Sequence, residues 1–137
     1  MKIEPYLFFN GRAEEAITFY ETNLGATREM LMRFNESPDP APPGMIPEGF
    51  ETKVMHASLI IGESRLLLSD GCEPGAPGFS SFSLALNVDG VAEAERAFNA
   101  LCEGGEVRMP LGKTFFAASF GMVADKFGVT WSVIAEA

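Results

Sequence analysis

The chain has 137 residues, 47% of them hydrophobic, and a formal net charge of −9 at pH 7. This length suits one compact domain or two tightly fused halves with a substantial core. The acidic charge, with no basic stripe, argues against a nucleic-acid partner, and the apolar runs are too short to cross a bilayer. The N-terminus, MKIEPYLFF, shows no cleavable signal pattern, so we expect a cytoplasmic protein.

Hydrophobic alternation and turn residues divide the first half of the chain into a strand, a helix and three further strands. The Asn10-Gly11 pair is a turn signal before the helix, and Gly25 suits its end because glycine adopts positive φ at little cost. In the first strand Tyr6 and Phe8 share one face. The expected ranges are Lys2–Phe9 for the first strand, Ala13–Leu24 for the helix, and Thr27–Phe34, His56–Ile61 and Ser64–Asp70 for the other strands.

Two segments rich in proline and glycine interrupt this pattern. Asn35–Phe50 holds five prolines and two glycines, so we expect a long loop, and such loops in compact domains are usually functional or mobile. The second segment, residues 72–79, is the best boundary between two halves. We therefore expect a single domain, residues 1–137, built from a module at 1–71 and a module at 80–137 that are joined by this linker.

The second half repeats the order of the first. The stretch NGRAEEAITFYETNLG, from Asn10, returns as DGVAEAERAFNALCEG, from Asp89. SFSLALNV predicts a strand before this second helix, and EVRMPLGKTFFAASFGMVADKFGVTWSVI predicts three strands after it, with turns at Leu111–Lys113 and Asp125–Gly128. Each half is thus a βαβββ module, and one module cannot bury both faces of its sheet alone. The predicted fold class is α+β, with two modules packed together.

These segments resemble the vicinal oxygen chelate superfamily, the group of glyoxalase I, bleomycin-resistance proteins and extradiol dioxygenases, and more narrowly its PhnB-like branch. PYLFFNGRAEEAITFYETNLG, VMHASLIIGESRLLLSD and MPLGKTFFAASFG followed by DKFGVTW carry the resemblance. It implies tandem βαβββ modules that form a curled mixed sheet around a cleft, and a homodimer. Some members of this branch bear a 3-demethylubiquinone methyltransferase label, but the chain lacks the glycine-rich strand-to-helix fingerprint that such an enzyme would use for its cofactor.

Metal enzymes of this superfamily take histidine and glutamate ligands from the first and last strands of each module, which leaves open positions for a substrate. No histidine occupies those positions in this chain. The residues there are Tyr6, Leu66–Ser69, Ser83–Ala85 and Trp131–Ile134. We therefore predict no metal and no other cofactor. The alternative is an unusual site that completes His56, the single histidine, with Glu4 or Asp70.

Without metal ligands, aromatic and small polar side chains would line the cleft, which is typical of a small-molecule site. The predicted ligand-binding residues are Tyr6, Phe8, His56, Ser69, Ser83, Phe116 and Trp131. A core position stays open for several of them. Phe115 and Phe116 would point to opposite faces of a strand, so one of the two is expected in the core. Trp131 also fits a buried packing residue with a satisfied N–H.

His56 is the candidate catalytic residue, because an imidazole titrates near neutrality and serves as a general base or as a hydrogen-bonding partner of a ligand. The alternative is a structural histidine bonded to a neighbouring strand or to the proline-rich loop. No GxSxG elbow is present, so Ser-His-Asp catalysis is poorly supported.

The predicted function is metal-independent binding of a small, partly aromatic molecule, with the Asn35–Phe50 loop as a lid. One alternative is an enzyme of lyase, isomerase or dioxygenase type with an unusual metal site near His56. A further alternative is a dimeric scaffold with a vestigial cleft. The expected partners are a small-molecule ligand and a second copy of the chain, and neither nucleic acid nor a membrane.

Overall fold

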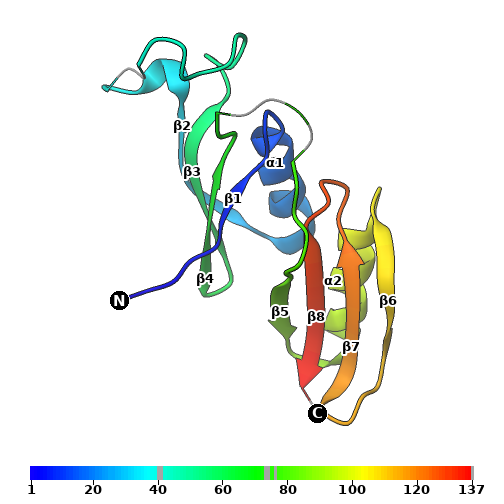
Figure 1. The fold of residues 1–137 in the computed structure, drawn as a ribbon. Helices are drawn as coiled ribbons and strands as arrows, with labels where there is room; N and C mark the ends of the chain where they lie inside the picture. The colour runs from blue at the N-terminus through cyan, green and yellow to red at the C-terminus, as the bar shows by residue number, and fades with distance from the viewer. Residues whose placement is uncertain (40–41, 73–74, 76, 137) are drawn as a thin grey trace. The chain divides into compact units, whose positions relative to one another are not determined.

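The computed structural model describes residues 1–39, 42–72, 75 and 77–136. The chain forms two compact units, Met1–Pro77 and Gly78–Ala137, and each contains a strand, a helix and three further strands in that order (Figure 1). The prediction of an α+β fold with two tandem βαβββ modules is confirmed, and each module forms a four-stranded mixed sheet of its own. None of the described helices is long and apolar enough to span a bilayer.

In the first unit the strand order across the sheet is β1-β4-β3-β2, with β1 parallel to β4 and the other pairs antiparallel. The first strand is shorter than predicted: pairing begins where Tyr6 lies opposite Leu67, directly after Pro5, which has no N–H to donate to a sheet. The elements are β1 (Tyr6–Phe8), α1 (Ala13–Leu24), β2 (Thr27–Arg33), the 3-10 turn η1 (Phe34–Glu36), β3 (Val54–Ile61) and β4 (Ser64–Ser69).

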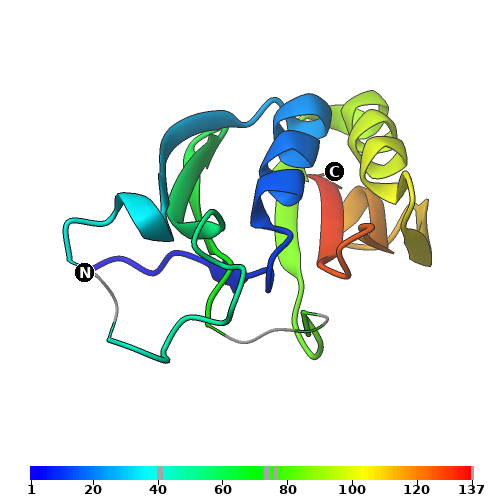
Figure 2. The ribbon, with the colours of Figure 1, turned by 90° about the horizontal axis from the view of Figure 1, so that it is seen from above.

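The first sheet has a covered face and an open face. Leu7, Leu68 and Ala57 form one row across the sheet and are buried, and α1 contacts β3 and β2. The next row, Tyr6, Leu67 and Ser58, points to the opposite side because neighbouring strand residues alternate. We call this opposite side the open face of the first unit. Seen from above, α1 lies along one side of its sheet (Figure 2).

The first two residues of the predicted loop Asn35–Phe50 belong to the 3-10 turn η1, which directly follows β2. Its two ends are held together, since the Asn35 N–H donates to the Glu51 carbonyl at 2.9 Å and Phe50 is buried. Pro40 and Ala41 of the loop, and residues 73, 74 and 76 of the predicted linker, lie outside the described residues.

In the second unit the strand order is β5-β8-β7-β6, and β5 is parallel to β8. The helix α2 covers one face and packs on β7 and β8, behind the sheet in the view of Figure 1. Its inward residues Ala94, Phe98 and Leu101 are buried, as the helical spacing predicts. The elements are β5 (Leu84–Val88), α2 (Gly90–Cys102), β6 (Glu106–Gly112), β7 (Ala117–Ala124) and β8 (Thr130–Glu136).

Candidate functional site

Three predicted site residues come together on the open face of the first unit. The Tyr6 hydroxyl, from β1, lies 2.8 Å from Nδ1 of His56, on β3, and so bridges the intervening strand β4. The Phe8 ring stacks on the Tyr6 ring, with 4.9 Å between centroids and 13° between planes. Tyr6 and Phe8 remain 41% and 48% exposed. Partial burial raises the pKa of the Tyr6 hydroxyl, which keeps its hydrogen at neutral pH.

The sheet register explains why these residues meet. Parallel pairing puts Tyr6 opposite Leu67 and Phe8 opposite Ser69, and antiparallel pairing puts Leu67 opposite Ser58. His56 is two residues before Ser58 and therefore on the same face. Ser69 is buried and locally bonded, since its hydroxyl accepts the Gly71 N–H at 2.9 Å. The Ser69 hydroxyl therefore stabilises the end of β4, opposite Phe8, and is already engaged in a hydrogen bond.

A polar cluster borders the aromatic group on the same face. Arg65 Nε and Nη2 donate to the two carboxylate oxygens of Glu29 at 2.8 and 2.9 Å, and the Ser58 hydroxyl donates to Glu29 Oε1 at 2.8 Å. The bonds from Arg65 and then Ser58 lower the pKa of the Glu29 carboxyl to about 2. Arg65 Nη1 also reaches Glu4 at 3.4 Å. The charged groups of this cluster therefore neutralise one another.

The other three predicted residues lie in the second unit. The Ser83 hydroxyl is 2.8 Å from that of Ser132. Trp131 is buried, and its indole N–H donates to Asp125 Oδ2 at 2.9 Å. Phe116 is 49% exposed, with its ring edge-on to Phe120. Trp131 and Phe116 thus occupy different settings, a core and a surface.

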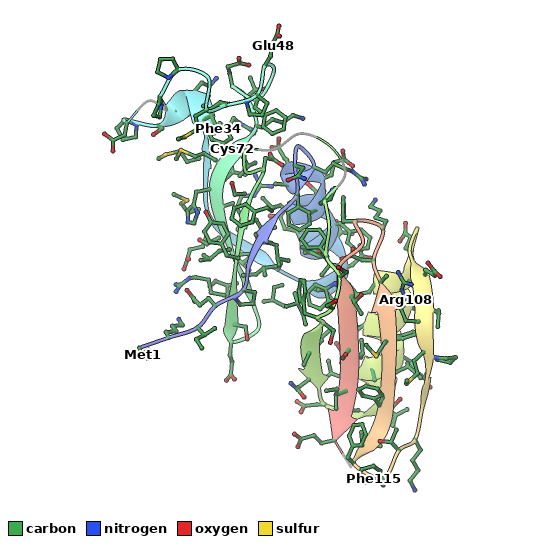
Figure 3. All side chains as sticks on the ribbon, in the orientation of Figure 1. Met1, Phe34, Glu48, Cys72, Arg108 and Phe115 are labelled. Atoms are coloured by element: carbon green, nitrogen blue, oxygen red, sulfur yellow. The ribbon has the colours of Figure 1, made fainter. Side chains whose placement is uncertain are left out.

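The expectation that Phe115 or Phe116 belongs to the core is wrong. The two residues precede β7 instead of lying in it, and Phe115 is 99% exposed, at the end of the loop between β6 and β7 (Figure 3). The loop is held by Thr114, whose backbone N–H donates to the Ala117 carbonyl and whose hydroxyl accepts the Ala117 N–H. The alternation argument fails because it assumes strand geometry where the chain turns.

Asp70 and Glu4, which were considered as metal ligands beside His56, form hydrogen bonds and ion pairs with other groups of the protein. Asp70 is 1% exposed, and its two oxygens accept the N–H groups of Gly11, Ala13 and Val54 at 2.7–2.8 Å. Glu4 pairs with Lys2 at 3.1 Å and with Arg65. The described part of the chain contains no group of three or more His, Cys, Asp or Glu side chains that could hold a metal ion. Glu4 and Asp70, the two carboxylates considered as companions of His56, are thus bonded to other groups of the protein.

Asp70 has a structural role that sequence reasoning missed. Helix α1 begins with Arg12 at its N-cap, and no side chain of its own first turn caps it. Asp70, 57 residues later, supplies the missing acceptor for the Ala13 N–H. An available signal was the poor capping residue at position 12, which requires an acceptor from another part of the chain.

Comparison with known proteins gives a consistent set of matches. The family model described as 3-demethylubiquinone-9 3-methyltransferase matches residues 1–134. Protein YjdN of Escherichia coli (strain K12) is 36% identical over 97% of this chain and 94% of its own length.

Solved structures match over almost the whole chain. Protein PA1353 of Pseudomonas aeruginosa is 48% identical, with a TM-score of 0.85 over 99% of this chain and 98% of that one. A Bacillus cereus protein described as a putative 3-demethylubiquinone-9 3-methyltransferase, PhnB protein, is 27% identical, with a TM-score of 0.79 over 98% and 99%. A glyoxalase-related enzyme from Fulvimarina pelagi shares the fold at 17% identity, with a TM-score of 0.64 over 99% and 88%.

Proposed function

The chain belongs to the 3-demethylubiquinone-9 3-methyltransferase family, within its PhnB-like group of glyoxalase-fold proteins, and from that premise we propose that it binds a small, partly aromatic molecule without a metal ion. We do not propose methyl transfer, because the sequence lacks a glycine-rich nucleotide fingerprint. The proposed site is the group of Tyr6, Phe8 and His56 on the open face of the first unit.

The observation that carries the proposal is the exposed pair of stacked rings beside a fixed imidazole. Exposed aromatic surface next to a few oriented polar groups is typical of a small-molecule site. Tyr6 and Phe8 supply the apolar surface, and the Tyr6–His56 hydrogen bond fixes the orientation of the polar group. We leave Trp131 out of the proposed site because its indole is buried and directed at Asp125.

The experiment uses two natural reporters. His56 and Trp131 are the single histidine and the single tryptophan of the chain, so the imidazole and indole signals in NMR spectra are assigned to them directly. We expect small aromatic compounds, added to protein kept in a metal chelator, to move the His56 signal and leave the Trp131 indole signal in place. A response that requires added divalent metal would contradict the proposal, as would a panel of compounds that never moves the His56 signal.

We also propose that the chain pairs with a second copy through the aromatic loop of the second unit. Phe115 and Phe116 lie edge-on to each other, 5.2 Å between centroids, and Phe115 is almost fully exposed. The family resemblance implies a homodimer, so we propose that a second copy of the chain covers these two rings. Sedimentation of a Phe115→Ser variant is expected to show a weaker dimer. A variant that sediments like the wild-type dimer would contradict the pairing surface.

A further inference from the structure

We propose that the ligand of this site is a planar aromatic acid, bound as its anion by His56 and Tyr6 with the uptake of one proton. This inference rests on the proposed binding function and adds the charge and the chemical class of the ligand. Its physical basis is the set of hydrogen-bonding positions that the open face leaves unused.

The charged groups of the face already have partners. Both oxygens of Glu29 are bonded to Arg65, and the Ser58 hydrogen is also used on Glu29. Glu4, from the segment before β1, pairs with Lys2 and Arg65. The positive charges of Arg65 and Lys2 are therefore already compensated by the carboxylates of Glu29 and Glu4.

The ends of the neighbouring strands do not change this balance. Arg33, at the end of β2, is directed to Glu14 of α1, with contacts of 2.7 and 3.0 Å. Asp70, beyond the end of β4, accepts only backbone N–H groups among the described contacts. The Tyr6–His56 pair lies directly beside the stacked rings, so it is the polar group that a ligand on the rings meets first.

The neutral pair offers one donor and one acceptor. In the tautomer that we assign to neutral His56, the Tyr6 hydroxyl donates its hydrogen to Nδ1, which lies 2.8 Å away. A neutral imidazole carries one ring hydrogen, so that hydrogen is on Nε2. In the described part of the chain no other group bonds Nε2 of His56. The ligand therefore meets the Nε2–H donor and a lone pair of the Tyr6 oxygen.

Protonation of His56 turns the pair into an anion site. Nδ1 then carries a hydrogen and donates to the Tyr6 oxygen, so the Tyr6 O–H is released and can rotate toward the ligand. The site now presents two donors, the Tyr6 O–H and the Nε2–H of His56, and one positive charge. A carboxylate has two acceptor oxygens and forms short, strong hydrogen bonds with such charged donors. The proton comes from the solvent, and the ligand carboxylate compensates the new charge.

The stacked rings define the rest of the ligand. Phe8 and Tyr6 lie almost parallel, so they form a flat apolar wall beside the donors, and a planar ring fits such a wall best. The net charge of −9 repels an anion at long range, but salt at about 0.1 M screens this repulsion beyond about 10 Å. The contact donors therefore decide whether the anion binds.

The test compares two probes of the same shape. Benzoate is an anion and benzamide is neutral, and both are titrated calorimetrically at about pH 6 and pH 8, the range in which imidazoles change charge. We expect benzoate affinity to fall about tenfold or more between these values, with uptake of about one proton detected by changing the buffer. Benzamide affinity is expected to stay constant.

Variants assign the effect to the pair. His56→Gln is expected to abolish both the proton uptake and the pH dependence of benzoate binding. Tyr6→Phe keeps the ring wall and removes one donor, so benzoate is expected to bind about tenfold more weakly while benzamide changes little. Phe82→Leu, at a half-exposed ring of the second unit, is the control and should change neither.

The outcomes separate this inference from the proposed function. If benzamide binds as well as benzoate, or benzoate binds without proton uptake, the anion inference is wrong and the binding function stands. If neither probe binds and the aromatic panel also leaves the His56 signal in place, both fail. Benzoate binding that persists unchanged in Tyr6→Phe and His56→Gln would move the ligand to another surface and overturn both proposals for this site.

Discussion

Each unit contains one buried aspartate, and the two carboxylates stabilise the fold over very different distances along the chain. Asp70 bonds N–H groups that are 57, 59 and 16 residues away. Asp125 bonds the N–H groups of Phe127 and Val129 and the indole of Trp131, all within six residues. The Asp70 carboxylate thus joins segments of the first unit that are distant in sequence, and we call this set of bonds the long-range junction. The Asp125 carboxylate stabilises a local turn of the second unit. The duplicated module has two solutions to the same problem of satisfying buried N–H groups.

The largest loss of stability is expected when the long-range junction at Asp70 is broken. Asp70→Asn keeps the shape but places an amide donor against at least one of the three buried N–H groups, which costs about 3 kcal/mol of unfolding free energy. The matched variant Asp125→Asn should cost about half as much, because the backbone bonds between Asp125 and both Gly128 and Val129 still hold the turn.

Chemical denaturation of both variants measures this difference. Far-ultraviolet circular dichroism reports the whole chain, and fluorescence of the single tryptophan reports the second unit. Equal losses of stability in the two variants would show that the distance spanned by the junction is unimportant.

The second prediction concerns the residue that follows each helix-ending glycine. Gly25 and Gly104 both have positive φ, and they are followed by Ala26 in the first unit and Gly105 in the second. A Cβ atom at Gly105 would collide with the Ala124 carbonyl oxygen. We therefore expect Gly105→Ala to cost about 2 kcal/mol because the backbone must shift, whereas Ala26→Gly should cost about 1 kcal/mol through chain entropy.

Thermal unfolding of the two variants tests this pair. A Gly105→Ala protein as stable as the wild type would mean that the helix end and the β7 strand end separate easily in the second unit.

The sequence predicts the parts of this fold that depend on local pattern. The order of strands and helices, the left-handed Gly25 and the shared face of Tyr6 and Phe8 all follow from spacing and turn residues. The resemblance to PhnB-like glyoxalase-fold proteins is confirmed by the family match. Both kinds of inference use information carried by neighbouring residues or by whole motifs.

The parts that the sequence does not predict depend on register between distant strands. The Tyr6–His56 bond joins residues 50 positions apart and requires β1, β4 and β3 to align as they do, because a shift of one residue would move His56 to the covered face. The cap of α1 by Asp70 is equally non-local. The expectation that one of Phe115 and Phe116 is buried is wrong because both residues precede β7, and the alternation of faces holds only within a strand.

The third prediction compares one half-exposed phenylalanine from each unit, Phe8 at 48% and Phe82 at 45% exposed. Phe8 stacks on Tyr6 at the proposed site. Phe8→Ala should therefore weaken binding of whichever of benzoate and benzamide the protein takes, by about threefold to tenfold, the size of an aromatic pair interaction of 0.5–1.5 kcal/mol. Phe82→Ala should leave the affinity unchanged. Calorimetric titration of both variants checks this, and equal losses would remove the distinction between the two surfaces.

The smallest expected effect concerns the ion pairs of the two units. Arg65 and then Ser58 lower the pKa of Glu29 from 4.5 to about 2, and Arg96 lowers the pKa of Glu93 on the surface of α2. A carboxyl whose pKa is lower in the folded state stabilises the fold at pH values above its unfolded-state pKa. This stabilisation is lost as the pH falls toward the folded-state pKa. For Glu29 the window is from 4.5 down to about 2.

Glu29→Gln should therefore be less stable than the wild type at neutral pH, and the difference should shrink as the pH falls through that window. Glu93→Gln should show a smaller difference, because its pair joins residues three apart on one exposed helix, whereas Glu29 connects β2 to β3 and β4. Both differences should decrease in high salt, which screens exposed charges. Denaturant unfolding across this pH range measures the effect. If the stability difference between the wild type and Glu29→Gln grows on acidification, the ionised carboxylate of Glu29 is unfavourable in the folded state. The polar border of the open face would then destabilise the first unit.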